Sequence, residues 1–153
     1  MPADRGGAGS GWFAEHFRVG DLPRWRAVFA LVCAGAAFLC AGGMLEYGSG
    51  SPETHGTPAA TYWALLFALH VVAFGGAGLL AAFPPLTRLP IKLAWLALVV
   101  AIYLLAFAEW YTHQAAGSAS LGDWLARWTA YVPAAVATLI GLALSELPAP
   151  AEP

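Results

Sequence analysis

Four apolar stretches, each long enough to cross a lipid bilayer, constrain the fold of this chain more than any other feature. They cover approximately residues 27–47, 60–83, 91–113 and 128–147. A bilayer core requires about 20 apolar residues per helical span. Helices suit this solvent because they satisfy their own backbone N–H and C=O groups. Four spans and their loops occupy nearly all 153 residues. The sequence therefore predicts an all-α, polytopic membrane protein with no room for a second, soluble domain.

The composition agrees with lipid rather than water as the solvent. Only 10% of the residues are charged and 59% are hydrophobic, whereas a soluble domain carries about 25% charged residues. The formal net charge is −2, so there is no basic excess of the kind that nucleic-acid binding requires. Membrane lipid is the expected surrounding, and other membrane subunits or further copies of the chain are the expected partners.

Prolines mark several ends of the predicted spans. Pro58 and Pro90 stand where the second and third spans begin, and proline suits the first turn of a helix. We therefore expect an antiparallel four-transmembrane-helix bundle over residues 25–147. Tails over residues 1–24 and 148–153 flank this domain.

Two segments outside the spans have amphipathic character. Aromatic residues three and four apart alternate with charges over residues 11–25, and Leu121, Trp124, Leu125 and Trp128 recur with helical spacing before the fourth span. Such patterns are typical of short helices that lie in the membrane surface. We predict a short interfacial helix in the linker over residues 114–127. For the N-terminal segment two interpretations stay open, an interfacial helix or an ordered tail that packs on the bundle.

The basic residues predict the orientation. Six of seven lie before the first span or beside the turn between the second and third spans, at Arg5, Arg18, Arg24, Arg26, Arg88 and Lys92. Only Arg127 falls on the other side. Because Lys and Arg are enriched in cytoplasmic loops, we expect a multi-pass protein of the inner membrane with both termini in the cytoplasm. The loops over residues 48–59 and 114–127 then face outward.

Glycines are concentrated in the first two spans, at Gly35, Gly42, Gly43, Gly75, Gly76 and Gly78. Small residues allow the close backbone approach on which helix association in lipid depends. The glycines therefore predict helix-packing faces. Glu46 shares one such face with Gly35, Leu39 and Gly42, so its carboxylate is expected to point toward another helix.

Ionisable groups gather at the outward ends of the spans. Glu109 and His113 are one helical turn apart, about 6 Å along the axis, and Glu46 ends the first span. Carboxylate and imidazole groups bind Zn, Cu or Fe, and they also relay protons, for example to a quinone. The alternative is a polar collar in which Glu, His, Tyr and water bond one another.

His70 lies near the middle of the second span, among apolar residues. Ionisable groups at this depth face the protein interior or a cavity. Three interpretations follow: a cofactor ligand to haem iron or chlorophyll magnesium, a proton carrier, or a structural hydrogen bond to Tyr103 or Thr138. A haem held by two histidines would require a second mid-membrane histidine, which the sequence lacks.

Cysteines and aromatic residues in the spans have structural interpretations. Cys33 and Cys40 are seven residues apart on one helix, about 10 Å along its axis, too far for a disulfide. With Met44 they present soft ligands suited to copper(I), although the spacing also suits packing. Tyr62 and other aromatic residues at the outward rim are typical of an interfacial belt.

These features support three hypotheses for function. The first is an accessory, assembly or partner-binding subunit of a larger membrane complex, such as a respiratory or photosynthetic one. The second is a small redox or metal enzyme that uses Glu46, Glu109 and His113 at the outer face and His70 deeper. The third, a transporter or channel, requires more polar residues in the spans than the chain offers. No catalytic-serine, zinc-protease or phosphate-loop motif occurs.

Overall fold

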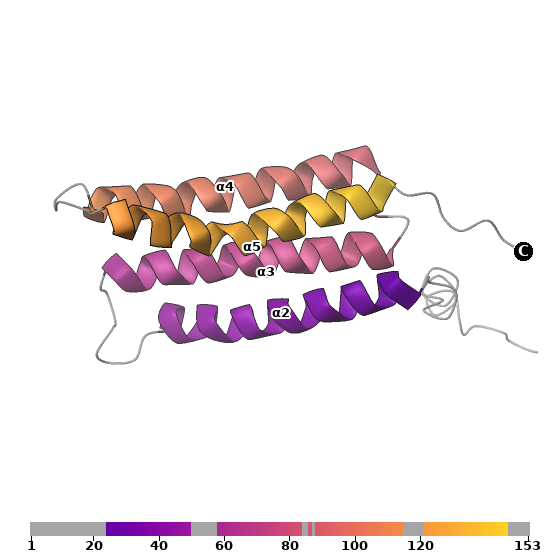
Figure 1. The fold of residues 1–153 in the computed structure, drawn as a ribbon, viewed down its shortest axis with the longest axis horizontal. Coiled ribbons are helices and arrows are strands. Elements are labelled where there is room, and N and C mark those ends of the chain that lie inside the picture. The colour runs from indigo at the N-terminus through magenta and orange to yellow at the C-terminus, as the bar shows by residue number, and fades with distance from the viewer. Residues whose placement is uncertain (1–23, 50–57, 84–85, 87, 115–120, 147–153) are drawn as a thin grey trace, which may run out of the picture.

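The computed structural model describes residues 24–49, 58–83, 86, 88–114 and 121–146. They form four helices, α2 (Arg24–Ser49), α3 (Pro58–Ala82), α4 (Leu89–Gln114) and α5 (Leu121–Glu146) (Figure 1). The described ranges contain no strand. All four helices are long and apolar enough to cross a membrane. The predicted all-helical class and its four apolar helices are confirmed, whereas the interfacial helix or ordered tail expected at the N-terminus precedes the described residues.

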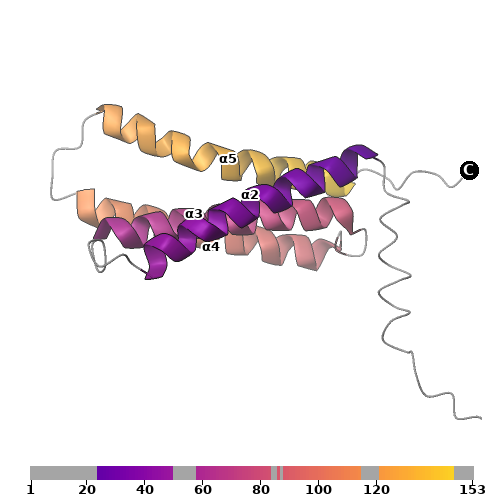
Figure 2. The ribbon, with the colours of Figure 1, turned by 90° about the horizontal axis from the view of Figure 1, so that it is seen from below.

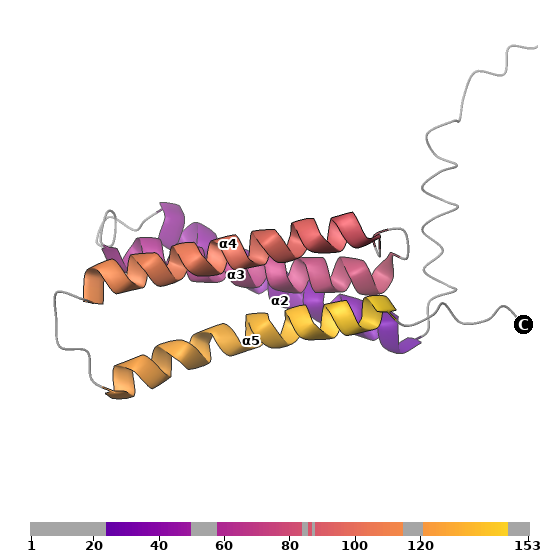
Figure 3. The same cartoon turned by 90° about the horizontal axis from the view of Figure 1, so that it is seen from above.

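Helix α3 holds the central position. It makes extended contact with α2, α4 and α5, whereas α4 and α5 pack mainly on α3 rather than on each other. Consecutive helices run in opposite directions (Figure 1). We name the two ends of the molecule by a residue: the Tyr62 end, where α3 begins, and the Lys92 end, where α4 begins. Figures 2 and 3 show α5 diverging from α4 toward the Tyr62 end.

Small residues build the interior. Ala73, Ala77 and Ala81 of α3 and Ala106 of α4 are completely buried. Association of helices in lipid depends on close packing, because the lipid tails are as apolar as the side chains. The largest cluster of buried residues joins three helices through Tyr62, Leu66, Leu69, Ala73, Val99, Ala106, Trp110, Tyr131 and Ala134.

Trp95 of α4 fills the space between α3, α4 and α5. Its indole Nε1 donates a hydrogen bond of 2.9 Å to the carbonyl of Val72. A Cβ atom added at Gly76 would lie only 2.0 Å from the same nitrogen, and one added at Gly141 would lie 3.3 Å from Trp95 Cη2. The two glycines therefore provide the room that the indole occupies.

Glycines also set the contact of α2 with α3. A Cβ at Gly43 would lie 2.9 Å from the Phe67 ring, and a Cβ at Gly78 would lie 3.0 Å from Cys33 Cβ. For Gly43, Gly76 and Gly78 the predicted packing role is thus confirmed.

Gly35, Gly42 and Gly75 make no such contact among the described helices, because a Cβ at any of them would meet nothing within 4 Å. Leu39 is 75% exposed and Glu46 is exposed too, so the face that they share with Gly35 and Gly42 points away from the other described helices. The reason is that α2 has one extended neighbour, α3. A helix with one extended neighbour buries mainly one face.

The linker before the fourth span differs from its prediction. Instead of a separate surface helix over residues 114–127, the structure continues α5 from Leu121 to Glu146 through Pro133. The helical spacing that begins at Leu121 continues through Leu125 and Trp128 to Val132, so the pattern gives no helix end between the linker and the fourth span. Proline removes one N–H donor from a helix, and here it lies on an exposed face.

Two basic side chains connect α2 and α4 to α5 at the Lys92 end. Lys92 Nζ and Glu146 Oε1 are 2.5 Å apart, and Arg26 Nη2 donates a hydrogen bond of 3.1 Å to the carbonyl of Leu144. The last carbonyls of a helix lack partners within the helix and favour cations. Arg26 from α2 and Lys92 from α4 therefore both hold the C-terminal end of α5.

Candidate functional sites

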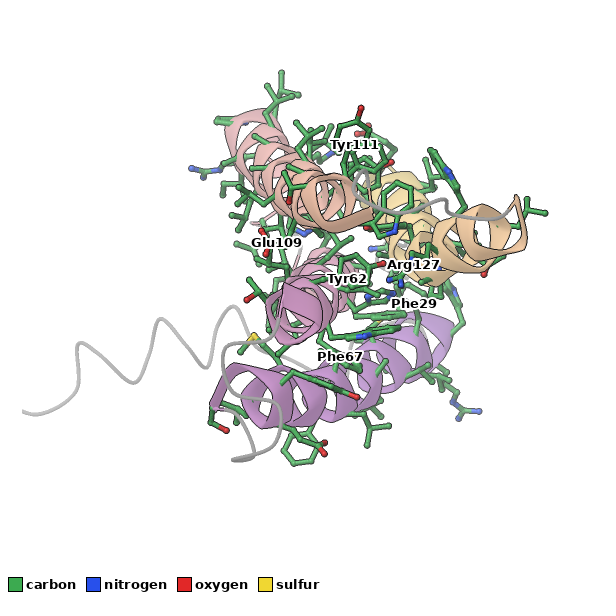
Figure 4. The ribbon with its side chains drawn as sticks, turned by 90° about the vertical axis from the view of Figure 1, so that its left-hand side faces the viewer. Phe29, Tyr62, Phe67, Glu109, Tyr111 and Arg127 are labelled. Atoms are coloured by element: carbon green, nitrogen blue, oxygen red, sulfur yellow. The ribbon has the colours of Figure 1, made fainter. Side chains whose placement is uncertain are left out.

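The structure does not bring Glu46 to Glu109. Glu46 is exposed on α2, Glu109 is half-buried on α4, and α3 lies between these two helices (Figure 4). The backbone of His113 belongs to α4, but its side chain is outside the described residues. No group of three His, Cys, Asp or Glu side chains gathers in the described part of the chain. The metal-binding pair of Glu109 and His113 therefore stays a prediction.

His70 is buried on α3, with 9% of its surface exposed. Its Nδ1 atom lies 2.7 Å from the carbonyl oxygen of Leu66, one turn earlier in the same helix. Because a carbonyl only accepts, Nδ1 carries the proton and donates it. Nε2 is then the ring nitrogen with the free electron pair.

The expected cross-helix bond from His70 to Tyr103 or Thr138 is not formed. Thr138 Oγ1 donates to the carbonyl of Ala134 at 2.8 Å, and the described bond of His70 is to its own helix. The carbonyl four residues earlier is always within reach of such side chains, so local bonds compete well with bonds between helices.

The cysteines follow the packing interpretation. Cys33 is almost completely buried and clusters with Ala77 and Ala137, while Cys40 is half-buried, and both thiols are free.

A polar cluster that the sequence did not reveal lies at the Tyr62 end, between α3 and α5. Tyr62 and Tyr131 are only 3% and 8% exposed, and neither hydroxyl has a hydrogen-bond partner in the described part of the chain. The guanidinium carbon of Arg127 lies 5.1 Å from the centroid of the Tyr62 ring. Figure 4 shows Tyr62 and Arg127 directed into the same space. We call Tyr62, Arg127 and Tyr131 the tyrosine–arginine cluster.

Neighbouring aromatic rings hold the cluster in place. Tyr103 of α4 meets Tyr131 edge to face, with 5.0 Å between ring centroids. Tyr62, Tyr103 and Arg127 are close enough to Tyr131 to interact with its hydroxyl electrostatically. The hydroxyls of Tyr62 and Tyr131 lie near hydrogen-bond distance of each other, but their geometry does not meet that of a formed hydrogen bond. The cluster thus presents two neutral donors and one cation, with no carboxylate bonded to them among the described residues.

The local sequence explains how this cluster forms. Arg127 and Tyr131 are four residues apart on α5, hence on one face, and Tyr62 lies in the second turn of α3. Sequence reasoning assigned Tyr62 to an interfacial belt. The available signal was Arg127, the one basic residue on its side of the predicted membrane.

Comparison with known proteins adds no identity: no protein family, no curated protein and no solved structure matches this chain.

Proposed function

We propose that this chain is a non-catalytic, partner-binding subunit of a larger complex in the inner membrane, and that α2 binds the partner. The observation that carries the proposal is the outward face of α2. Its exposed residues are Leu31, Val32, Gly35, Phe38, Leu39, Gly42, Leu45 and Glu46. We call this surface the outer α2 face.

The outer α2 face has the form that accepts another transmembrane helix. Gly35 and Gly42 lie two turns apart, and a Cβ at either would meet nothing within 4 Å. Large side chains such as Phe38 and Leu39 flank them. A second helix gains van der Waals contact by approaching the backbone over such small residues.

Glu46 favours a protein over lipid as the occupant. Its carboxylate is exposed near the end of α2 and forms no ion pair or hydrogen bond with the described residues. An ionisable group at the edge of a lipid-facing surface is costly unless it finds a partner. A helix with a basic or amide side chain at this depth would satisfy it.

A second copy of the chain suits this face less well than a different protein. Two copies insert with the same topology, so a symmetric contact through the outer α2 face would set Glu46 against Glu46. Like charges at close range repel. The proposed topology follows the basic residues, with the Lys92 end in the cytoplasm and Glu46 toward the outside.

Site-specific photo-crosslinking in native membranes tests this proposal. A photoreactive residue replacing Gly42 should give one discrete product of higher mass, and the same residue replacing Leu105, which is equally exposed on α4, should give none. Gly42→Leu and Glu46→Ala should each reduce recovery of that partner after mild detergent extraction. Equal crosslinking from both positions, or crosslinks only between copies of this chain, would overturn the proposal.

His70 supports a second candidate function, cofactor binding. Histidines that ligate metals commonly donate their other ring N–H to a backbone carbonyl, which is the bond that Nδ1 makes to Leu66. Nε2 would then bind a haem iron, a chlorophyll magnesium or a metal ion. An absorption spectrum and elemental analysis of the purified chain test this, with His70→Ala as the comparison. Retention of any bound pigment or metal by His70→Ala would exclude His70 as its ligand.

A further inference from the structure

We infer that the tyrosine–arginine cluster binds the phosphate of an anionic membrane lipid. The first reason is the pair of buried hydroxyls of Tyr62 and Tyr131, which have no partner among the described residues. Buried polar groups in folded proteins are nearly always hydrogen-bonded, and an unsatisfied one is costly. A single oxygen placed near both hydroxyls would accept from both.

The second reason is charge. Arg127 is half-buried over the Tyr62 ring and forms no ion pair with the described residues. It is also the only Lys or Arg after Lys92 in the sequence. A water molecule would satisfy the two hydroxyls but would not supply the counter-charge that the guanidinium lacks among the described residues. An oxyanion satisfies all three groups, because donors to a charged oxygen form the stronger hydrogen bonds.

The third reason is the surface beside the cluster, which distinguishes a lipid from a free anion. Helix α5 diverges from α4 toward the Tyr62 end (Figures 2 and 3). Its exposed side there carries Leu125, Trp128 and Val132, which share one helix face. Arg127 and Trp128 are consecutive residues, about 100° apart around the helix, so the acyl chains of a lipid whose phosphate is held by Arg127 would run along the neighbouring apolar face at Trp128 and Val132. A free phosphate would use none of them.

Thermal unfolding of the full chain in maltoside detergent, followed by circular dichroism, tests the inference. Titration with phosphatidylglycerol should raise the unfolding temperature, whereas inorganic phosphate and phosphatidylcholine should raise it far less. R127Q and the double variant Y62F/Y131F should each weaken the apparent affinity for phosphatidylglycerol about tenfold or more, as loss of a charge-assisted hydrogen bond implies.

Matched variants separate binding from folding. R88Q removes an exposed cation at the opposite end, and Y111F removes an exposed hydroxyl at the same end, so both should retain the wild-type response. Without lipid, Y62F/Y131F should unfold at the wild-type temperature or above it, because neither hydroxyl is bonded to the described chain.

Three results would overturn the inference. They are a wild-type chain that does not respond to phosphatidylglycerol, an R127Q variant that responds fully, and equal protection by inorganic phosphate, which would indicate a free-anion site. The inference is independent of the outer α2 face, so Gly42→Leu should leave the lipid response intact.

Discussion

Gly76→Ala should lower the free energy of unfolding more than a glycine-to-alanine substitution at any other glycine of α3. The new Cβ would lie 2.0 Å from Trp95 Nε1, 2.4 Å from Cε2 and 2.5 Å from Cδ1. Non-bonded heavy atoms prefer a separation of about 3.5 Å, so the indole would have to move by about 1.5 Å.

The indole has little freedom to move. Its Nε1 donates to the carbonyl of Val72, and its Cη2 lies close to the backbone of α5 at Gly141, where an added Cβ would be 3.3 Å away. Overpacking of this kind costs about 1–3 kcal/mol, and loss of the hydrogen bond adds about 1 kcal/mol. Alanine returns at most about 1 kcal/mol through its higher helix propensity. The net destabilisation should be about 1–3 kcal/mol.

Gly75→Ala is the matched control, since it adds the same methyl group one residue earlier, where nothing lies within 4 Å. It should be neutral or slightly stabilising. Unfolding by sodium dodecyl sulfate in mixed micelles, followed by circular dichroism, measures both variants. In a double-mutant cycle, Trp95→Leu should remove most of the cost of Gly76→Ala, because the obstacle is gone. Equal stability of Gly76→Ala and Gly75→Ala would refute the reasoning.

Three further predictions use the same unfolding assay or a labelling assay. Gly43→Ala should lower the free energy of unfolding by about 1 kcal/mol. This is less than for Gly76→Ala, because the added methyl group meets the Phe67 ring, which can rotate away. Gly42→Ala should leave the free energy of unfolding unchanged, and a larger loss for Gly42→Ala than for Gly43→Ala would contradict the assigned face of α2. Arg26→Ala should cost about 1–3 kcal/mol through its bond to the Leu144 carbonyl, whereas the exposed Arg24→Ala should stay within about 0.5 kcal/mol. A single cysteine at position 88, in a chain whose Cys33 and Cys40 are replaced by alanine, should resist a membrane-impermeant maleimide in intact cells and react after lysis; reaction before lysis would reverse the proposed topology.

The apolar helices were predictable because hydropathy depends on whether a segment prefers lipid or water, and not on which helix packs against which. Helix ends were harder. Leu121 to Arg127 carry an amphipathic pattern that a surface helix and the first turns of α5 share. Only the continuation of that spacing to Val132 distinguishes the two.

The side that a helix presents was not predictable from one sequence. The sequence does not distinguish Gly35 from Gly43, yet only Gly43 contacts α3. Glu46 was assigned to the interior because charged groups avoid lipid. It lies instead on the face of α2 that no described helix covers, so the partner that its charge requires would come from outside this chain.

The candidate sites divide in the same way. His70 was found because its depth alone makes it unusual. The tyrosine–arginine cluster was missed because Tyr62 and Tyr131 come from helices whose pairing the sequence does not state, and each tyrosine by itself suits an interfacial belt.

The central position of α3 has a consequence for biosynthesis. The helix that touches all the others is the second of the four described helices, so its contact with α2 can form before α4 and α5 have been translated. Helices α4 and α5 can then each pack on α3 as they are made, because their main contact surface precedes them in the sequence. Assembly can proceed in the order of translation, and the Arg26 contact to Leu144 is the step that joins the beginning of the nascent chain to its end.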